Sequence, residues 1–437
     1  MVGFPHAAAR STVPMNLNYA RYIDKWAGLV ICLVLFALER TVGRIFGRAI
    51  PSLLATTPPR DDTPPSPPRR ILCIKFYGLG NAVMLLPVLA AVKRRFPEAE
   101  IDFLTFVNNL AILERSGVVT RVLGVDVSTT SGFLRTMWDA VRTLHRRRYD
   151  VVLDFEQFVK VSTVLAFLSG ARERIGFNTD GQRRGFMYTK RVVYTDSDHM
   201  SAIFARLARP LGVEGELPVA TLRLRDEERA KVRQFLAEAG LAPDHFPLVA
   251  MHPGIGMNFY RIPLKRWEPA NFAAVADALA ERYGAAVVFT GRGAEERRLI
   301  AEVRAHMRRP PIDACDRFTV CELAALLERC HFVVANDTSA MHLAALMGTP
   351  VVALFGPTAP LHYGPRGDRH IVLYRDLYCS PCLTNYNLKA SRCLDPVCMR
   401  GIRPEAVLEA IATHYLGETA TQRDWIRLRP AAAASAA

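Results

Sequence analysis

Residues 331–358, HFVVANDTSAMHLAALMGTPVVALFGPT, decide the fold of this chain. The stretch holds two short apolar runs, HFVVA and PVVALF, and apolar residues recur between them at helical spacing. This pattern is typical of a β-α-β unit in a buried parallel sheet. The capping residues NDTS, at 336–339, would start the helix and leave its first backbone N–H groups free for an anion. The turn FGPT, at 355–358, ends the second strand at the edge where open α/β sheets bind ligands.

Length and composition indicate a folded protein of two domains. The chain has 437 residues, of which half are hydrophobic and 22% are charged. Its net charge of +14 favours nucleic acid, an anionic membrane surface or phosphorylated substrates as partners, with a scattered solvated surface as the alternative. Because no basic motif interleaved with aromatics occurs in the sequence, we expect membrane lipid and nucleotide phosphates, and no nucleic acid. The nine cysteines, an odd number, favour a reducing cytosol over a secreted disulfide framework.

Residues 1–54 form an apolar and basic segment that we expect to associate with a membrane. Its apolar run at 26–38, WAGLVICLVLFAL, is flanked by Arg and Lys and is shorter than the roughly 18 residues that span a bilayer. Three interpretations stay open: a short signal-anchor helix, a helix lying in the cytoplasmic leaflet, and a signal peptide, which the lack of a nearby cleavage site disfavours. The basic flanks predict attachment to the cytoplasmic face of the inner membrane. Whether residues 26–46 span the bilayer or lie on it stays open.

Two α/β series follow a proline-rich linker at 55–70. In the first series, 71–222, we predict strands at 71–76, 100–106, 120–125, 149–155 and 191–195, with helices between them. In the second series, 223–416, we predict strands at 248–254, 285–291, 331–337 and 350–356. Such alternation predicts two mostly parallel sheets covered on both faces, with a ligand cleft between their carboxyl edges. We expect the last helix, 403–416, to pack back across the cleft, and residues 417–437 to form a flexible tail.

The order D-T-S-x-x-H-L-A-A, then G-x-P-V-V-A-L-F-G-P-T, resembles the donor-site signature of glycosyltransferase family 9. The best-known members of that family are the ADP-heptose:lipopolysaccharide heptosyltransferases, and the resemblance covers about residues 71–416. It implies a GT-B fold, in which two Rossmann-like domains face each other across a cleft, here with the N-terminal membrane-associating segment added. It also implies a nucleotide-diphospho-sugar donor, by analogy ADP-heptose, and a lipopolysaccharide core or related glycolipid as acceptor.

The resemblance places the donor site in the second domain. Lys265, in a K-R-W segment, would neutralise the diphosphate, although it is also interpretable as a solvated residue before a helix. Glu295 or Glu296 would accept hydrogen bonds from the ribose, and the choice between them stays open. Ser339 stands where the family has a glycine. The full predicted donor set is His252, Gly254, Lys265, Arg266, Glu295, Glu296, Asp337, Thr338, Ser339, His342, Gly356 and Thr358.

The acceptor side departs from the family pattern. Asn81 follows the first glycine turn, where heptosyltransferase-like members carry an Asp that is proposed as general base. An amide takes no proton at neutral pH, which leaves a different base, a mechanism driven by leaving-group stabilisation, or loss of catalysis. Asp154 and Glu156 are the nearest substitutes, with a strand-end turn as their alternative role. Lys160 matches a basic family residue that would meet an anionic acceptor.

We predict no metal and no cofactor. The cysteines Cys379, Cys382, Cys393 and Cys398 include a C-x2-C pair, but the spacing of the second pair makes a zinc site the less favoured interpretation. The D-x-D triplet expected of a metal-dependent sugar transferase occurs at 196–198, in the acceptor half, where a capping turn is favoured. Lys, Arg and helix N-termini would then receive the departing diphosphate.

Two rival functions stay open. A transferase that uses a UDP- or GDP-sugar fits the same motifs. A catalytically silent protein that binds a nucleotide sugar or a glycan is the rival from another class, and Asn81 motivates it.

Overall fold

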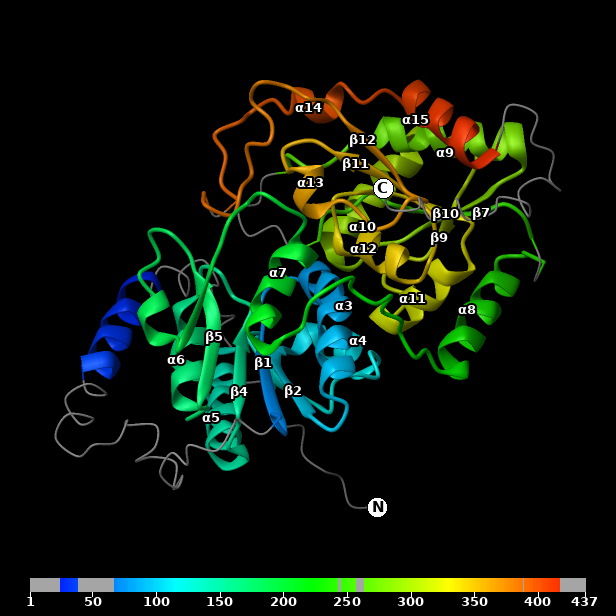
Figure 1. Ribbon diagram of the computed structural model, residues 1–437. Helices are drawn as coiled ribbons and strands as arrows, with labels where there is room; N and C mark the ends of the chain where they lie inside the picture. Colours follow the sequence, from blue (N-terminus) through cyan, green and yellow to red (C-terminus); the bar gives the residue numbers. More distant parts are fainter. Residues whose placement is uncertain (1–23, 38–66, 243–244, 257–262, 388, 417–437) are drawn as a thin grey trace, which may run out of the picture.

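The computed structural model describes residues 24–37, 67–242, 245–256, 263–387 and 389–416 (Figure 1). These residues form two six-stranded sheets in which every recorded strand pair is parallel. The strands of the first sheet are β1 (Arg70–Ile74), β2 (Glu100–Phe106), β3 (Arg121–Val125), β4 (Val151–Asp154), β5 (Glu173–Asn178) and β6 (Lys190–Val193). Those of the second are β7 (Leu248–His252), β8 (Ala286–Phe289), β9 (Ile312–Asp313), β10 (Phe332–Asn336), β11 (Val351–Phe355) and β12 (Ile371–Tyr374).

Helices connect the strands, as expected of parallel sheets. In the first domain they are α3 (Leu79–Arg95), η1 (Val107–Asn109), α4 (Leu110–Glu114), α5 (Thr130–Arg147), α6 (Lys160–Leu168), η2 (Gly185–Met187), α7 (Met200–Ala208) and η3 (Arg209–Leu211). In the second they are α8 (Asp226–Glu238), α9 (Pro269–Tyr283), α10 (Gly293–His306), α11 (Val320–Arg329), α12 (Ser339–Leu346), α13 (Pro360–Tyr363), α14 (Val397–Arg400), α15 (Pro404–Ile411) and the π-helix η4 (Ala412–Leu416).

The first sheet has the strand order β3-β2-β1-β4-β5-β6 and is buried on both faces. Ile71 and Cys73 of β1 pack with α3 and α7 on one face, while Leu72 and Ile74 pack with α5 and α6 on the other. This alternation follows from the two-residue repeat of a strand. Strand β5 is absent from the sequence prediction, because charged residues interrupt its apolar run and mask the periodic signal.

The second sheet has the order β12-β11-β10-β7-β8-β9, so the predicted β-α-β unit supplies its central strands β10 and β11. The two strands that the sequence analysis missed here, β9 and β12, are short and lie at the two edges of the sheet. Short edge strands carry little periodic signal.

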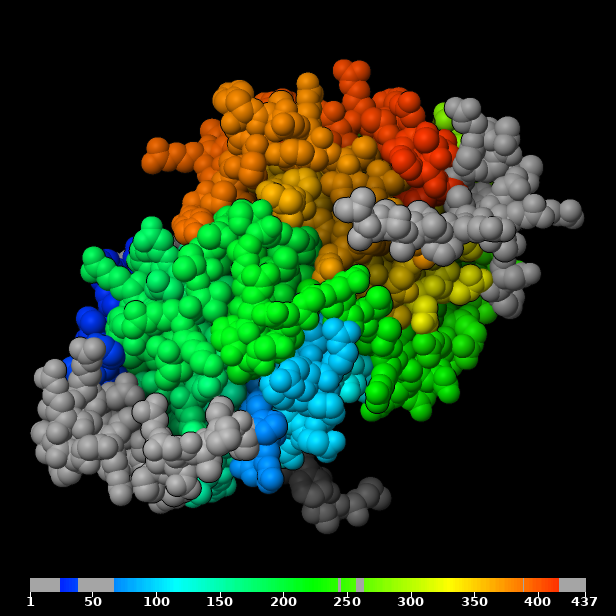
Figure 2. All heavy atoms as spheres, viewed as in Figure 1, coloured from blue at the N-terminus to red at the C-terminus, as the bar shows by residue number. Residues whose placement is uncertain are grey.

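The two domains meet through helices that follow the central strands. α3 follows β1, α12 follows β10, and their buried apolar residues belong to one continuous cluster that reaches both sheets. A Cβ atom at Gly80 would lie 2.8 Å from Cδ2 of His342, so glycine at this position allows the first turn of α3 to approach α12. Figure 2 shows the second domain's orange loops resting on green elements of the first domain. The two carboxyl edges therefore lie beside each other, while the predicted cleft between them stays a prediction.

The C-terminal helix differs from the expectation. α15 packs against α9, and its residues Val407 and Ile411 share an apolar cluster with Trp267 and Phe272. Figure 1 shows α15 on the side of the second domain that faces away from the first. α15 therefore covers the outer face of its own sheet instead of crossing to the first domain.

The N-terminal segment is described only at residues 24–37, which form a helix beside α6 (Figure 1). Among the described residues, no helix combines the length and the apolar character needed to cross a membrane. The rest of the predicted membrane segment, residues 55–66 of the linker and the predicted tail at 417–437 lie outside the described residues.

Candidate functional site

The donor edge of the second sheet is built around the Asp337 carboxylate. Lys265 Nζ lies 3.0 Å from Asp337 Oδ2 and donates to the Asp337 carbonyl at 2.7 Å, and Thr358 Oγ1 donates to Oδ2 at 2.7 Å. Burial raises the pKa of Asp337, but the charge of Lys265 and the Thr358 hydrogen bond outweigh it and lower the pKa below its usual value. Loops after β7, β10 and β11 thus bring a cation, a carboxylate and a hydroxyl together.

The first turn of α12 carries two further predicted residues, Thr338 and His342. The buried Thr338 Oγ1 has no hydrogen-bond partner among the described residues. Such a group is rare unless a ligand or water satisfies it. Burial lowers the pKa of His342 to about 4 against the opposing charge of Asp337, so its imidazole is neutral at pH 7. A helix N-terminus with an unpaired hydroxyl and a nearby ammonium is suited to an anionic ligand.

Glu295 and Glu296, between which the sequence left the choice open, differ in burial and in their partners. Glu296 is buried and accepts hydrogen bonds from the backbone N–H groups of Gly256 at 3.2 Å and Arg292 at 2.7 Å. Glu295 is largely exposed and forms an ion pair with Arg266. His252 joins the inner group, because its Nδ1 lies 3.0 Å from Thr290 Oγ1 and its Nε2 lies 3.8 Å from Glu296 Oε1. Of the two carboxylates, Glu296 is therefore the buried one, and the backbone of the loop after β7 holds it in place.

The predicted glycines have packing roles. A Cβ at Gly254 would lie 2.0 Å from Glu296 Oε1, so this glycine lets the carboxylate lie against the backbone. A Cβ at Gly356 would lie 2.4 Å from Met399 Sδ, which means that Gly356 accommodates the segment around α14. Ser339 begins α12 and is half-buried. Gly356 thus faces the core of the domain, in contrast to the ligand contact that the resemblance implies.

Two residues of this edge were missed as ligand-site elements. Asn336 was interpreted only as a cap, yet its Nδ2 donates to Pro253 O at 2.8 Å and its Oδ1 accepts from Trp267 N at 3.2 Å, which ties the loop after β7 to the Lys265 segment. Lys389 lies with Nζ 3.9 Å from the centroid of the Tyr363 ring. Burial lowers the pKa of Lys389 to about 8, while the charge of Asp337 opposes the shift. The loop that contains Lys389 has no periodic pattern, so its sequence gave no signal of this position.

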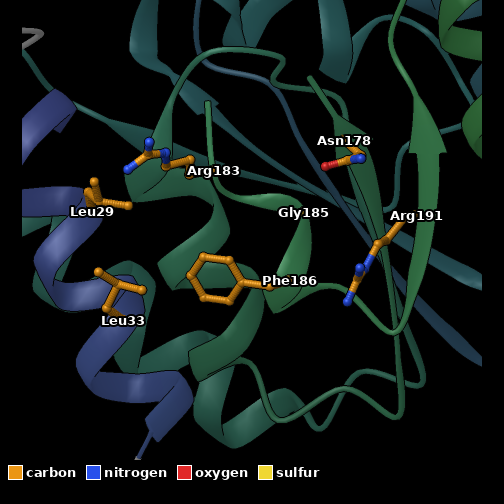
Figure 3. Close-up of a pocket in the computed structure, with 7 residues that line it drawn as sticks. All are labelled: Leu29, Leu33, Asn178, Arg183, Gly185, Phe186 and Arg191. Carbon is orange, nitrogen blue, oxygen red and sulfur yellow. The ribbon is translucent and has the colours of Figure 1, made fainter. Parts of the chain in front are cut away.

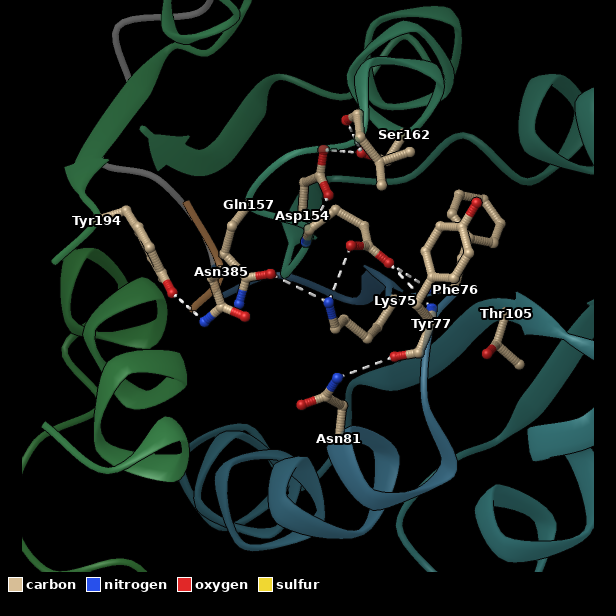
Figure 4. Close-up of polar contacts among 12 residues, drawn as sticks. Lys75, Phe76, Tyr77, Asn81, Thr105, Asp154, Gln157, Ser162, Tyr194 and Asn385 are labelled. Atoms are coloured by element: carbon tan, nitrogen blue, oxygen red, sulfur yellow. Dashed lines mark hydrogen bonds and ion pairs between the residues drawn. The ribbon is translucent and has the colours of Figure 1, made fainter. Parts of the chain in front are cut away.

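The acceptor edge of the first sheet is centred on a buried ion pair (Figure 4). Lys75 Nζ lies 2.9 Å from Glu156 Oε2, and the other carboxylate oxygen of Glu156 accepts from Phe76 N at 2.6 Å. Lys75 Nζ also donates to Gln157 at 3.2 Å. Asn81 donates to the Tyr77 carbonyl at 3.1 Å, and its Oδ1 accepts no recorded hydrogen bond from the described residues. Lys75 was not predicted, because a lone Lys after an apolar run resembles an ordinary strand end.

Asp154 occupies a different environment from Glu156. It is fully buried, 2.6 Å from Arg184 Nη2, and accepts hydrogen bonds from Tyr188 Oη at 2.6 Å and Ser162 Oγ at 2.8 Å. With Arg184 also fully buried, this is a structural ion pair. The arrangement therefore gives Asp154 no route to an acceptor hydroxyl.

Lys160 is covered by the N-terminal helix. Only 3% of the residue is exposed, and a Cβ at Gly28 would lie 2.9 Å from Lys160 Cβ. Its backbone N–H donates to Asp24 Oδ2 at 2.8 Å. Lys160 thus anchors residues 24–37, in contrast to the open acceptor contact expected from the resemblance.

All cysteines of the described residues are free thiols. Among these residues, no group of three or more His, Cys, Asp or Glu side chains is arranged to hold a metal ion. The cysteine loop reaches the first domain, where Asn385 donates to Tyr194 Oη at 2.7 Å. His199 Nε2 and the Gly364 carbonyl form a second bridge at 2.9 Å. These two hydrogen bonds link the second domain to the first. The absence of a metal stays a prediction.

Comparisons with known proteins identify relatives of this chain. The family model of glycosyltransferase family 9 (heptosyltransferase) matches residues 137–391, more than half of the chain. Lipopolysaccharide heptosyltransferase 3 of Escherichia coli is 24% identical over 311 residues, covering 70% of this chain and 88% of the relative. Lipopolysaccharide heptosyltransferase 1 of Pseudomonas aeruginosa is 23% identical over 365 residues, covering 77% and 96%.

Solved structures share the fold. A glycosyltransferase family 9 protein of Veillonella parvula superposes with a TM-score of 0.67 at 24% identity, covering 79% of this chain and 96% of the other. The Escherichia coli heptosyltransferase WaaC with ADP superposes with a TM-score of 0.58 at 18% identity, covering 79% and 99%. Two parallel-sheet α/β domains are thus the arrangement that this chain shares with heptosyltransferases.

Proposed function

Because this chain belongs to glycosyltransferase family 9, and is therefore a glycosyltransferase, we propose that it transfers heptose from ADP-heptose to a lipopolysaccharide core or related surface glycolipid. Its curated relatives are lipopolysaccharide heptosyltransferases, which supports glycosyl transfer in the synthesis of that core. A related structure contains ADP, which supports the choice of nucleotide.

One observation carries the proposal: Lys265, Asp337 and the Thr338 hydroxyl, which has no partner among the described residues, lie together at the N-terminus of α12. In the proposal, the donor diphosphate lies against this turn, and Lys265 receives part of its charge. Lys389, whose charge interacts with that of Asp337, supplies a second cation. Glu296 accepts from the ribose, and neutral His342 offers a hydrogen bond without repelling the cations.

Transfer forms a bond between the acceptor oxygen and the anomeric carbon and breaks the bond between that carbon and the diphosphate. The diphosphate leaves with the electron pair, and the acceptor proton needs a base. Of the predicted candidates, Glu156 remains for this role at the acceptor edge, but Lys75 already occupies its Oε2 and the Phe76 N–H already occupies its Oε1. We therefore assign most of the rate acceleration to stabilisation of the leaving diphosphate, with Asn81 orienting the acceptor hydroxyl.

We also propose that the protein works at the cytoplasmic face of the inner membrane, where a glycolipid acceptor is at hand. Trp26 and Val30 of the N-terminal helix are more than half exposed, which supports this location. Asp24 of the same helix binds the backbone at the start of α6, so the helix begins next to the acceptor edge.

A turnover assay tests the function. Purified full-length protein is incubated with ADP-heptose and glycolipid extract, and product is measured by mass spectrometry for the wild type, Asp337→Ala and the control Asp226→Ala, which changes an exposed aspartate of α8. We expect product with the wild type and the control but not with Asp337→Ala. Nucleotide binding without any transfer would support the silent binding protein, whereas transfer only from UDP- or GDP-sugars would retain the transferase and reject ADP-heptose.

A further inference from the structure

The helix at residues 24–37 is apolar on two opposite faces. Its inner face packs on the first domain: Cys32 is fully buried with Phe167 and Met187, and the rings of Phe36 and Phe186 lie 4.9 Å apart. On the outer side, the apolar side chains are 47–60% exposed; these are Trp26, Val30, Ile31, Leu33 and Val34. A helix that is apolar all round is stable in a protein core or in lipid.

The inner contacts hold this helix in a fixed place. Asp24 accepts hydrogen bonds from the N–H groups of Lys160 at 2.8 Å and Val161 at 2.7 Å, and so caps α6 from a distant part of the sequence. Gly28 lets the helix lie directly on Lys160. The outer apolar face is thus held outward from the first domain.

A pocket of about 410 Å³ lies between this helix and the edge of the first sheet (Figure 3). Leu29 and Leu33 line it from the helix, and Phe186 lines it from η2. Arg183 and Arg191 line the same pocket from the η2 loop and from β6. Apolar walls and two guanidinium groups therefore share one pocket beside the outer face of the helix.

Both arginines are free to bind an anion. Each side chain is exposed, and neither guanidinium group has a hydrogen bond or ion pair with any of the described residues. The nearby carboxylate of Asp180 accepts from Gly181 N at 2.9 Å within its own turn. Arginine forms paired hydrogen bonds with phosphate oxygens and is less strongly hydrated than lysine.

We propose that this pocket binds the headgroup phosphate of an anionic bilayer phospholipid while the outer face of the 24–37 helix enters the acyl boundary. Charge complementarity selects this occupant, because a phospholipid joins a phosphate to apolar chains as the pocket joins arginines to apolar walls. Lys25, with Nζ 5.7 Å from the Trp26 ring, adds a cationic and aromatic pair suited to the same interface. The inference deepens the membrane location given in the proposed function and rests on it.

The test is sedimentation of full-length protein with vesicles of phosphatidylcholine alone or mixed with phosphatidylglycerol. We expect the wild type to prefer the anionic vesicles and the double variant Arg183→Ala/Arg191→Ala to lose about 30-fold in partitioning to them. The control Arg233→Ala/Arg298→Ala removes the same charge from exposed positions on α8 and α10 and should bind as the wild type does. Thermal unfolding of each variant confirms that it is folded.

A second pair of variants tests the helix. Val30→Asp/Val34→Asp should weaken binding to vesicles of both compositions, because it places charge on the outer face without changing the pocket. Release of the wild type when phosphate replaces chloride at equal ionic strength would identify free phosphate as the ligand and overturn the lipid assignment. Light scattering could instead show that the wild type is a dimer, that the valine variant is a monomer, and that vesicle binding is unchanged. This result would identify a second copy of the chain as the partner of the outer face and would also overturn the lipid assignment.

The outcomes separate the two proposals. Equal binding of anionic vesicles by the two arginine double variants would overturn the assignment of the pocket as a headgroup site. It would leave the proposed membrane location in place. Failure of the wild type to bind any vesicle would overturn both the pocket and the membrane location. Neither result bears on sugar transfer, which the turnover assay measures separately.

Discussion

The donor edge and the acceptor edge both place charged side chains at the ends of parallel strands, yet they use them differently. At the donor edge, the side chain of Lys265 is 25% exposed and that of Asp337 is 10% exposed, and the Thr338 hydroxyl has no partner among the described residues. At the acceptor edge, Glu156 and Lys75 are each 3% exposed, and Asp154 is sealed against Arg184. The donor edge is thus suited to an anionic ligand, whereas the acceptor-edge charges mostly stabilise the first domain.

The largest effect is expected when the buried ion pair at the acceptor edge is removed, and it is an effect on the stability of the fold. Arg184→Met should lower the free energy of unfolding by about 3–5 kcal/mol, because it leaves the buried Asp154 carboxylate without its counter-ion. Urea denaturation measures this change. The adjacent exposed residue gives the control, since Arg183→Met should have little effect. An equal loss of unfolding free energy in Arg184→Met and in the control would show that Asp154 does not depend on Arg184, and would contradict the structural role given to the acceptor-edge charges.

The next effect is on catalysis at the donor edge. Lys265→Ala should reduce kcat/KM about 10²- to 10³-fold, because the departing diphosphate loses a preorganised cation. Steady-state transfer assays measure the change, with Lys231→Ala on the surface of α8 as a control. Retention of more than half of the activity by Lys265→Ala would mean that the phosphate lies elsewhere.

A pH titration tests the second cation. Burial lowers the pKa of Lys389 to about 8, so its ammonium is present below that pH and is lost as pH rises through it. Nucleotide affinity should therefore fall by about tenfold as pH rises through about 8. Calorimetry across that range should show the fall in the wild type and a flat response for Lys389→Met. The same slope in both proteins would assign the effect to another group.

The smallest effect is expected at the acceptor turn. Asn81→Asp should leave the transfer rate unchanged or lower it, because the proposal places the proton acceptor at Glu156 and most of the rate acceleration at the leaving group. A rise in kcat would instead indicate that the position works best with a carboxylate and that Asn81 marks a weakened catalyst.

The sequence predicted most strands of both sheets and missed three: β5, inside the first sheet, and β9 and β12, at the edges of the second. β1, β10 and β11 carry long apolar runs with small-residue turns, so their pattern identified both sheets. β5, β9 and β12 are interrupted by charge or very short, and their pairing depends on neighbours that the local sequence does not reveal.

Site residues show the same limit. The resemblance named Lys265, Asp337 and Thr358, which the structure brings together. It could not reveal that Lys389, from a distant loop, lies over the ring of Tyr363, because such a contact depends on tertiary packing. Nor could spacing reveal that the N-terminal helix covers Lys160.

The central claim, that the N-terminus of α12 holds the diphosphate of an ADP-linked donor, is tested most directly by calorimetric titration of the full-length protein with ADP, UDP and GDP. Lys265→Ala and Asp337→Ala are measured alongside the wild type. We expect tightest binding of ADP, weakened by both substitutions. Binding of ADP that neither substitution changes would contradict the assigned site, and no binding of any nucleotide would contradict the function itself.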